Sequence, residues 1–251
     1  MKSLRMINVA KSNSEKKKIM IYYTGDTHGD VEKLYNFKER FGLTAEDTIV
    51  ILGDAGWNYD RGIHDYLSKM FLKRMGVTIF SIHGNHEERP YNLPHYHEIE
   101  WRGGTVYVED DYPNNLFGKD GEIYDLDGHR AIVIGGAYSV DKPYRLAHGY
   151  NWFPSEQPDA TIKTIVEASL DVEGWNIDLV LSHTCPQKYV PVEAFMSCVD
   201  QSTVDRSTEE WLDTIEDRLT YNHWLCGHWH IDKTIDRFRF VMDDFVTIDN
   251  T

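Results

Sequence analysis

The 251-residue sequence lacks several features that would by themselves assign it to a class of protein. It has no stretch of roughly eighteen consecutive apolar residues, the minimum for a membrane-spanning helix, so we expect no membrane span. Residues 1–18 lack the apolar segment and cleavage site of a signal peptide and predict a polar N-terminal extension. Repeats, low-complexity tracts and linkers are also missing, which predicts one domain over residues 1–251.

Cysteine is scarce. The chain has only Cys185, Cys198 and Cys226, an odd number without a Cys-x-x-Cys spacing. This pattern argues against a disulfide framework and indicates a reducing compartment. We therefore expect the protein to be cytoplasmic.

Positive charge is also in deficit, since 26 Lys and Arg residues face 41 Asp and Glu residues, for a formal net charge of −15. Such a chain repels phosphate backbones at long range, which argues against non-specific nucleic-acid binding and against a processive nuclease. A small anionic substrate stays compatible with this charge, because bound dications invert the local field. The net charge does not determine the oligomeric state.

The residues that are present predict a folded α/β protein. Hydrophobic residues make up 41% and aromatic residues 13% of the chain, which excludes a disordered one. Apolar runs at 18–24, 48–52 and 77–82 read as strands, and segments 31–41 and 63–75 have helical spacing. This β-α-β-α-β order predicts parallel strands joined by helices.

The middle of the chain has a different pattern. Segments 104–108, 122–126 and 130–134 are short strand candidates separated by turn residues, and they predict a second, antiparallel sheet. Residues 138–158 have little periodicity and many aromatic residues, so we expect a long loop that is a candidate cap over a substrate site.

The last third returns to alternating elements. We expect a helix at 159–170, a strand at 178–181, a helix from a Ser207–Glu210 capping box to Leu219, a strand at 223–226, and a closing hairpin of 236–241 with 245–248.

Five short polar segments each follow an apolar, β-rich run. They are Gly25-Asp26-Thr27-His28-Gly29, Gly53-Asp54, Gly84-Asn85-His86-Glu87, Ser182-His183 and Gly227-His228-Trp229-His230. Together they supply enough oxygen and nitrogen donors to hold two divalent metal ions at the edge of a sheet.

In these segments, and over roughly residues 19–248, the chain resembles the calcineurin-like metallophosphoesterases. The resemblance implies a four-layer α/β/β/α sandwich of two mixed sheets flanked by helices, with the metals at the strand ends. It also implies that Asp54 bridges both metals. Metal one would take Asp26, His28, Asp54 and His230, and metal two would take Asp54, Asn85, His183 and His228.

The resemblance further implies metal-dependent hydrolysis of a phosphate ester by a water or hydroxide between the two metals. His86 resembles the general acid that protonates the leaving group; alternatively it only orients the phosphate. Mixed imidazole and carboxylate ligands suit manganese, our first expectation, as well as iron, zinc, cobalt or nickel.

Arg89, Arg145 and Arg61 are the candidate substrate contacts. Many relatives carry an Asp-Arg-Gly motif close behind the bridging aspartate, but here Asp60-Arg61-Gly62 arrives three positions late, which places the role of Arg61 in question. We expect a phosphomonoesterase acting on a small-molecule or protein-borne phosphate. The alternatives are a phosphodiesterase acting on cyclic nucleotides, dinucleotides or nucleic-acid ends, and a binding scaffold without catalysis, which the intact ligand set disfavours.

Overall fold

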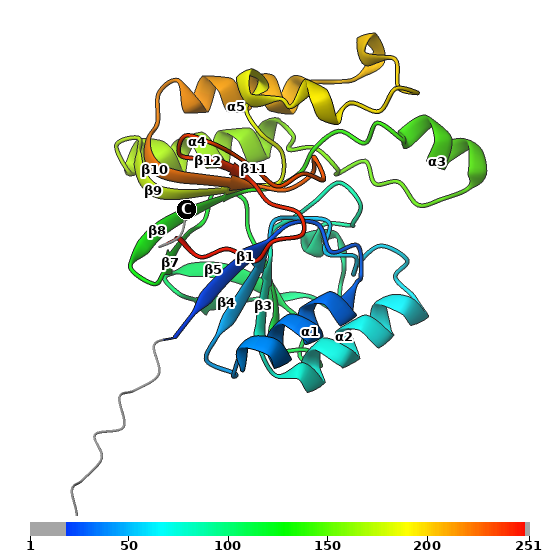
Figure 1. The fold of residues 1–251 in the computed structure, drawn as a ribbon, viewed down its shortest axis with the longest axis vertical. Coiled ribbons are helices and arrows are strands. Elements are labelled where there is room, and N and C mark those ends of the chain that lie inside the picture. Colours follow the sequence, from blue (N-terminus) through cyan, green and yellow to red (C-terminus); the bar gives the residue numbers. More distant parts are fainter. Residues whose placement is uncertain (1–18, 249–251) are drawn as a thin grey trace, which may run out of the picture.

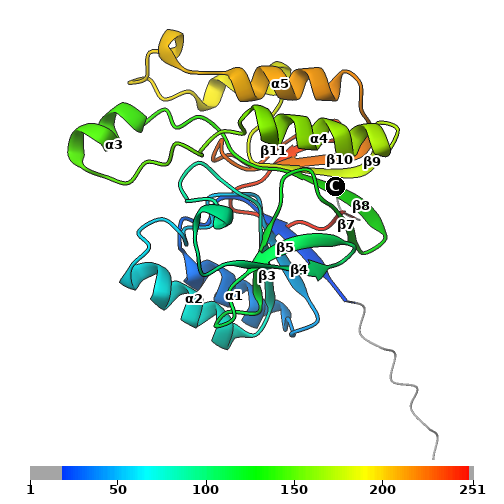
Figure 2. The ribbon, with the colours of Figure 1, turned by 180° about the vertical axis from the view of Figure 1, so that it is seen from behind.

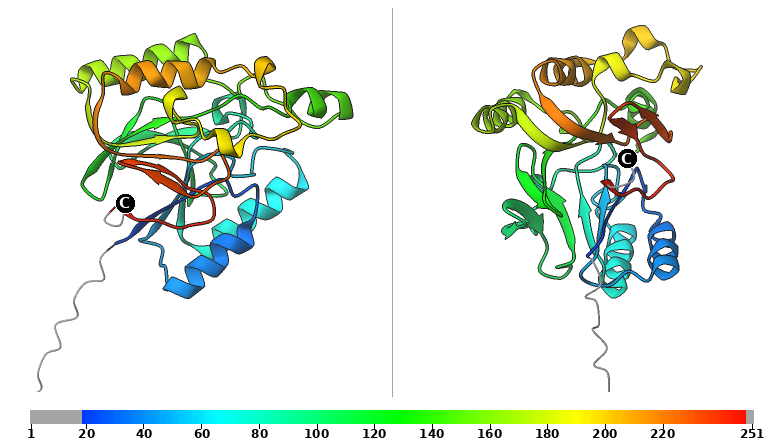
Figure 3. Two further views of the ribbon diagram at one scale, coloured as in Figure 1. Left: turned by 45° about the horizontal axis from the view of Figure 1, so that its top comes forward. Right: turned by 60° about the vertical axis from the view of Figure 1, so that its left-hand side comes forward.

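The computed structural model describes residues 19–248, so the predicted N-terminal extension, residues 1–18, lies outside the described part. Within that part, two six-stranded sheets pack face to face, and helices cover their outer faces (Figures 1 and 3). Both sheets combine parallel and antiparallel strands. This arrangement confirms the predicted α/β/β/α sandwich of two mixed sheets.

Two helices lie on each outer face. The helices α1 (Val31–Phe41) and α2 (Ile63–Met75) cover the first sheet, and α4 (Ala160–Val172) and α5 (Ser207–Glu216) cover the second (Figure 2). The bounds of α1 and α2 agree with the sequence-based prediction. Among the described helices, none combines the length and the apolar character that a bilayer crossing requires.

The first sheet carries the N-terminal half of the chain. Its strands, in spatial order, are β1 (Ile21–Thr24), β2 (Thr48–Ile51), β3 (Thr78–Ser81), β6 (Asn115–Gly118), β5 (Gly104–Val108) and β4 (His97–Trp101). The first four are parallel to one another, and β5 and β4 continue the sheet antiparallel.

The second sheet carries the remaining strands of the described chain. In spatial order they are β11 (Lys233–Ile235), β12 (Phe238–Phe240), β10 (Thr220–Cys226), β9 (Asn176–Ser182), β8 (His129–Ile134) and β7 (Ile123–Leu126). The four inner strands are parallel, and the two edge strands are antiparallel to their neighbours.

Apolar side chains fill the space between the sheets. Val50 and Leu52 of the first sheet meet Val133, Leu181 and Leu225 of the second in one buried cluster. The strands read as continuous apolar runs because a helix covers the other face of each sheet as well. Burial on both faces holds the strand ends firmly, and those ends carry the polar segments.

The assignment of Gly104–Val108 to the second sheet is wrong. This strand, β5, belongs to the first sheet, while β7 and β8 belong to the second. The difference arises from β6, which pairs parallel to β3 and antiparallel to β5, and so draws β4 and β5 into the first sheet. The short sequence of β6, Asn-Leu-Phe-Gly, gives little strand signal.

The expected loop at 138–158 contains a helix, α3 (Lys142–His148), which projects to one side of the molecule (Figures 1 and 2). Pro143 lies in its first turn, where proline is tolerated, and Gly149 ends it in a left-handed conformation with φ of 73°. The seven residues of this helix are too few for a helical period to be recognised in the sequence.

The predicted hairpin of 236–241 with 245–248 does not form. Instead β12 pairs with β11. The later segment crosses to the first sheet, where Val246 and Tyr23 exchange two backbone hydrogen bonds of 2.9 Å. The final residues of the described chain thus tie the second sheet to the first.

The predicted capping box of α5 is also absent. Ser207 is already the first helical residue, and its backbone N–H donates to the carboxylate of Asp205 over 2.9 Å. Asp205 therefore satisfies a free N–H at this helix end in place of the predicted serine cap, and the helix ends at Glu216 rather than Leu219.

Candidate metal centre

All seven predicted metal ligands follow the carboxyl ends of parallel strands. Asp26 and His28 follow β1, Asp54 follows β2, Asn85 follows β3, His183 follows β9, and His228 and His230 follow β10. The two packed sheets bring these ends to one place, so residues about 200 positions apart in sequence become neighbours.

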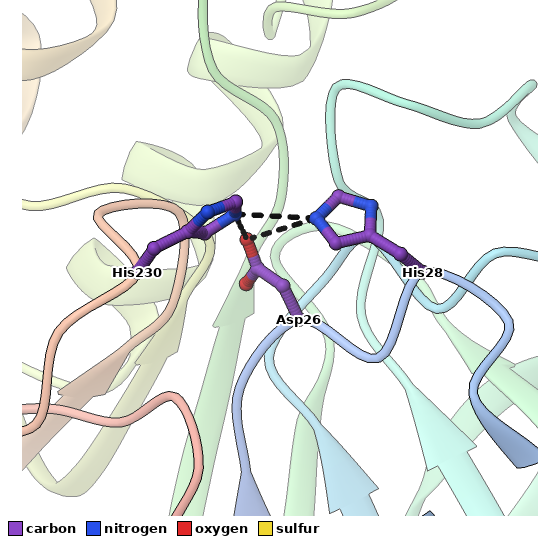
Figure 4. A group of neighbouring side chains, drawn as sticks. All are labelled: Asp26, His28 and His230. Atoms are coloured by element: carbon purple, nitrogen blue, oxygen red, sulfur yellow. Dashed lines mark hydrogen bonds and ion pairs between the residues drawn. The ribbon is translucent and has the colours of Figure 1, made fainter. Parts of the chain in front are cut away.

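A first group of donors comprises Asp26, His28 and His230 (Figure 4). Asp26 Oδ2 lies 3.1 Å from His230 Nε2 and 3.9 Å from His28 Nε2, and the two imidazole nitrogens lie 3.2 Å apart. The other carboxylate oxygen of Asp26 accepts the backbone N–H of His228 at 2.9 Å. The aspartate is thus oriented by the second sheet, with one oxygen left for a cation.

A second group comprises His183, Asn85 and Asp54. His183 Nε2 lies 2.8 Å from Asn85 Oδ1 and 3.6 Å from Asp54 Oδ1. His183 Nδ1 lies 2.8 Å from the carbonyl oxygen of Leu52, which can only accept. The Nδ1 atom must therefore carry the proton. The lone pair of Nε2 is then directed toward Asn85 Oδ1 and Asp54 Oδ1, the other candidate metal ligands.

Asp54 lies between the two groups. Its carboxylate is close to Asp26 and His183 on one side and to His28 and His86 on the other. Burial alone would raise its pKa, but the imidazoles of His183, His86 and His28 outweigh burial and hold the pKa of Asp54 below its usual value. A buried carboxylate that stays ionised among imidazoles suits the predicted bridging position.

His228 lies beside the second group. Its ring centroid lies 5.0 Å from that of His183. Burial, with a smaller contribution from His183, lowers the pKa of His228 to about 3. The imidazole is therefore neutral near pH 7, which is the state that binds a metal.

Four of the seven candidates have a backbone conformation that side chains rarely adopt. The φ angles are 45° for His28, 49° for Asp54, 65° for His228 and 51° for His230. Left-handed conformations at non-glycine residues are costly and gather at functional sites. Their presence here indicates that the surrounding structure imposes the direction of these side chains.

The approach of the loops to one another requires glycine at Gly84. A Cβ atom at this position would lie 2.1 Å from Asp54 Oδ1. The close contact lets Asp54 Oδ1 accept the backbone N–H of His86 at 2.8 Å, which links the β2 and β3 loops.

The donors fit a pair of divalent transition-metal ions. Carboxylate oxygens, an amide oxygen and imidazole nitrogens converge here, a mixture that suits such ions. Asp26, Asp54 and His183 are buried, whereas the side chains of His28 and His230 are 37% and 53% exposed. A cation held here would thus rest on buried carboxylates and be reached from solvent between the exposed imidazoles.

His86 lies beside this centre, with its ring centroid 5.3 Å from that of His28. The guanidinium of Arg145, on α3, approaches His86 Nδ1 with Nη2 at 2.9 Å. Arginine can only donate, so the His86 proton resides on Nε2, which lies 4.0 Å from Asp141 Oδ1. Burial, followed by the charge of Arg145, lowers the pKa of His86, so the imidazole is neutral near pH 7.

Arg145 is buried, and its Nη1 atom has no hydrogen-bond partner within residues 19–248. The other two predicted substrate contacts have different surroundings. Arg89 is also buried and also has an unpartnered Nη2 atom within the described residues, but it donates to the Asp120 carboxylate and, over 2.8 Å, to the Ser155 carbonyl oxygen. Arg61 is exposed and lies 5.7 Å from the centroid of the Phe153 ring. Of the three, Arg145 is the one that the structure joins to His86.

Two side chains near the centre were not identified from the sequence. Glu87 accepts the backbone N–H of Gly84 at 2.8 Å and that of Ala55 at 3.1 Å, and so clamps the loops that carry Asn85 and Asp54. Its place inside the Gly-Asn-His-Glu segment was the available signal. Ser139 accepts from Asn85 Nδ2 at 2.9 Å, and nothing in the sequence marks it.

Comparison with protein families gives a match over most of the chain. The sequence profile described as calcineurin-like phosphoesterase matches residues 19–232. No curated protein matches the chain. Among solved structures, the chain is similar to TT1561 of Thermus thermophilus, with 15% identity and a TM-score of 0.48 over 88% of this chain and 87% of that chain. A second solved structure matches with 13% identity and a TM-score of 0.47 over 88% of each chain.

Proposed function

The chain belongs to the calcineurin-like phosphoesterase family, whose members are metal-dependent phosphoester hydrolases, and from this premise we propose that it is a phosphomonoesterase with two divalent metal ions. The observation that carries the proposal is the convergence of metal-donor atoms in two groups that share Asp26. One group is Asp26, His28 and His230, and the other is Asp26, Asp54 and His183. His86 and Arg145 lie beside them. The first group would hold one metal with Asp54, and Asp54, Asn85, His183 and His228 would hold the other.

Two such ions, when bound, would polarise the phosphoryl oxygens and lower the pKa of a coordinated water molecule. Manganese is our first proposal for the metal, because the donor set mixes carboxylate, amide and imidazole groups. The chain itself contributes the orientation of these donors through Leu52, His228 and Glu87.

Two side chains of the protein act directly on the substrate in this proposal. Arg145 uses its unpartnered Nη1 atom to bind a non-bridging phosphoryl oxygen. His86 presents its Nε2 proton to the leaving oxygen. The guanidinium at Nδ1 makes that proton more acidic, so the hydrogen bond to the leaving oxygen strengthens as negative charge develops there.

A monoester is the preferred substrate because its terminal phosphate carries two negative charges and three non-bridging oxygens. A buried arginine beside two metals favours the more highly charged ester. The Gly84-Asn85-His86-Glu87 segment also resembles that of the Ser/Thr protein phosphatases. The alternative, a phosphodiesterase, would have to accommodate a second ester group beside the same guanidinium.

The test compares p-nitrophenyl phosphate with bis-p-nitrophenyl phosphate, using protein reconstituted with Mn²⁺. Because both esters release the same leaving group, the comparison isolates the effect of the second ester group. We expect kcat/KM for the monoester to be higher by at least about tenfold, the effect of one charge-assisted contact. A preference for the diester would instead identify a phosphodiesterase, and turnover of neither with any transition metal would reject the proposal.

Substitution of Arg145 tests the substrate contact. Arg145→Ala should lower kcat/KM for p-nitrophenyl phosphate by about 10- to 100-fold, because a hydrogen bond to a charged group contributes about 1.5–3 kcal/mol. Arg145→Lys should recover part of the loss, since it restores the charge without the planar guanidinium. Steady-state kinetics measures both variants.

Arg237→Ala is the matched control. Arg145 lies 5.5 Å from the centroid of the Tyr59 ring, and Arg237 likewise lies 4.2 Å from the centroid of the Tyr221 ring, but on the turn between β11 and β12. Equal activity of Arg145→Ala and the wild type would show that Arg145 only anchors α3.

We also propose that the protein works as one domain in the cytoplasm. Cys185, Cys198 and Cys226 are all free thiols, and Cys185 and Cys226 are buried in the core. Free buried thiols are typical of reducing compartments.

A further inference from the structure

Asn85 can bind a cation with only one end of its side chain. The amide has a carbonyl oxygen, which can ligate a metal, and an NH₂ group, which cannot. A rotation of the amide by about 180° would exchange the two. The orientation of Asn85 therefore has to be fixed by a neighbour, and the neighbour must accept a hydrogen bond from Nδ2 and not offer one to it.

Ser139 meets that requirement. It is 1% exposed, and its Oγ atom lies 2.9 Å from Asn85 Nδ2, while Asn85 Oδ1 faces His183 Nε2 at 2.8 Å. A serine hydroxyl has a single hydrogen. The hydroxyl accepts from Asn85 without ambiguity only if its own hydrogen is directed elsewhere.

Glu156 is the neighbour that can take that hydrogen. The residue is 3% exposed, Trp152 Nε1 donates to its Oε2 at 2.6 Å, and Ser139 acts on its carboxyl group as a hydrogen-bond donor that lowers the pKa. Burial raises the pKa of Glu156, and the hydrogen bonds from Ser139 and Trp152 oppose the increase. Trp152 and Ser139 both face this carboxyl group as donors, so the serine oxygen is left to accept from Asn85.

We propose that Ser139 and Glu156 are positioning residues for the second metal: they hold the Asn85 amide with Oδ1 toward the cation and Nδ2 away from it. This inference rests on the proposed function, because it assigns a metal to Asn85. The chain of contacts runs from Glu156 through Ser139 to Asn85 and joins the segment after β8 to the loop after β3.

Removal of the hydroxyl has a defined consequence. In Ser139→Ala, Nδ2 of Asn85 loses its acceptor, and the amide is free to turn its NH₂ group toward the cation. Loss of an outer partner of a metal ligand typically weakens metal binding by about 10- to 100-fold. The effect should be confined to one of the two metals, because the hydrogen bonds of Ser139 lead to Asn85 and Glu156 and not to Asp26, His28 or His230.

The experiment is a calorimetric titration of metal-free protein with Mn²⁺. Wild-type protein should bind two equivalents, and Ser139→Ala should bind one equivalent normally and the other about 10- to 100-fold more weakly. Glu156→Gln should weaken the same equivalent, since its amide can donate to the serine oxygen. The matched control is Ser155→Ala, because Ser155 lies in the same segment and its hydroxyl bonds to Glu88 and not to a metal ligand.

A second background separates positioning from general damage to the fold. In Asn85→Asp, both ends of the side chain are oxygens, so its orientation no longer matters. Ser139→Ala added to Asn85→Asp should then leave Mn²⁺ affinity unchanged or improved. An equal loss of Mn²⁺ affinity in both backgrounds would overturn the inference, and so would wild-type affinity in Ser139→Ala. In either case, wild-type protein that binds two equivalents would leave the proposed function intact. Failure of the wild type to bind Mn²⁺ or any other divalent transition metal would overturn both.

Discussion

Asp54→Asn should abolish hydrolysis while the protein stays folded. A neutral amide cannot neutralise two cations or bridge them with two oxygens, so the metals and their effect on the transition state are lost together. We expect kcat to fall at least about 1000-fold, the upper end of the loss when one electrostatic contact to a transition state is removed. The asparagine oxygen can still accept the His86 backbone N–H, which Asp54 Oδ1 accepts at 2.8 Å, so the loops keep their link.

Phosphate release, elemental analysis and circular dichroism check this result together. Wild-type protein reconstituted with Mn²⁺ should hold close to two equivalents, and Asp54→Asn clearly fewer, with unchanged dichroism. The control is Asp47→Asn, a buried carboxylate at the opposite end of the same strand, which accepts the backbone N–H of Met20 at 2.9 Å. Activity retained by Asp54→Asn at saturating Mn²⁺ would count against a bridging role.

His86→Ala should slow the hydrolysis of esters with poor leaving groups far more than that of activated esters. The loss for an alkyl phosphate should be about 100- to 10,000-fold, the usual contribution of a positioned proton donor. p-Nitrophenolate leaves without much help, so p-nitrophenyl phosphate should suffer much less. The measurement is kcat/KM over a series of alkyl and aryl phosphates of increasing leaving-group pKa.

A matched imidazole distinguishes the site from the general loss of a histidine. His95 is exposed and lies 3.6 Å from the Glu109 carboxylate, outside the candidate metal centre, so His95→Ala should behave as the wild type. If His86→Ala loses the same factor on alkyl and aryl esters, His86 orients the phosphate rather than acting on the leaving group. Arg145 on Nδ1 is compatible with both roles, so only the leaving-group series decides between them.

The sequence by itself determined the family, the α/β class and the positions of the seven ligand candidates. These features are local, because each candidate follows closely on an apolar run that is typical of a buried strand. In parallel strands the carboxyl ends share one edge, so the convergence of Asp26, Asp54 and Asn85 follows from the pattern alone. That these residues bind metal remains a prediction, since the structure adds only their proximity and orientation.

Sheet membership was beyond the reach of local patterns. The alternating burial of β5 suits an antiparallel strand in either sheet, and the choice depends on β6, whose four residues give little strand signal on their own. The closing segment is similar, since Val246 pairs with Tyr23 more than two hundred positions earlier. Pairing at such separations is decided by the packing of the complete core and not by propensity.

The tertiary structure alone decided which side chains surround the ligands. Arg145 was one of three arginines predicted to contact the substrate, and its contact with His86 depends on a seven-residue helix that lies 59 positions away along the chain. Ser139 carries no sequence signal, because a serine in a presumed loop resembles any solvated serine. Its role arises only when folding buries it between Asn85 and Glu156, where each polar group must find a partner and so fixes the direction of the next.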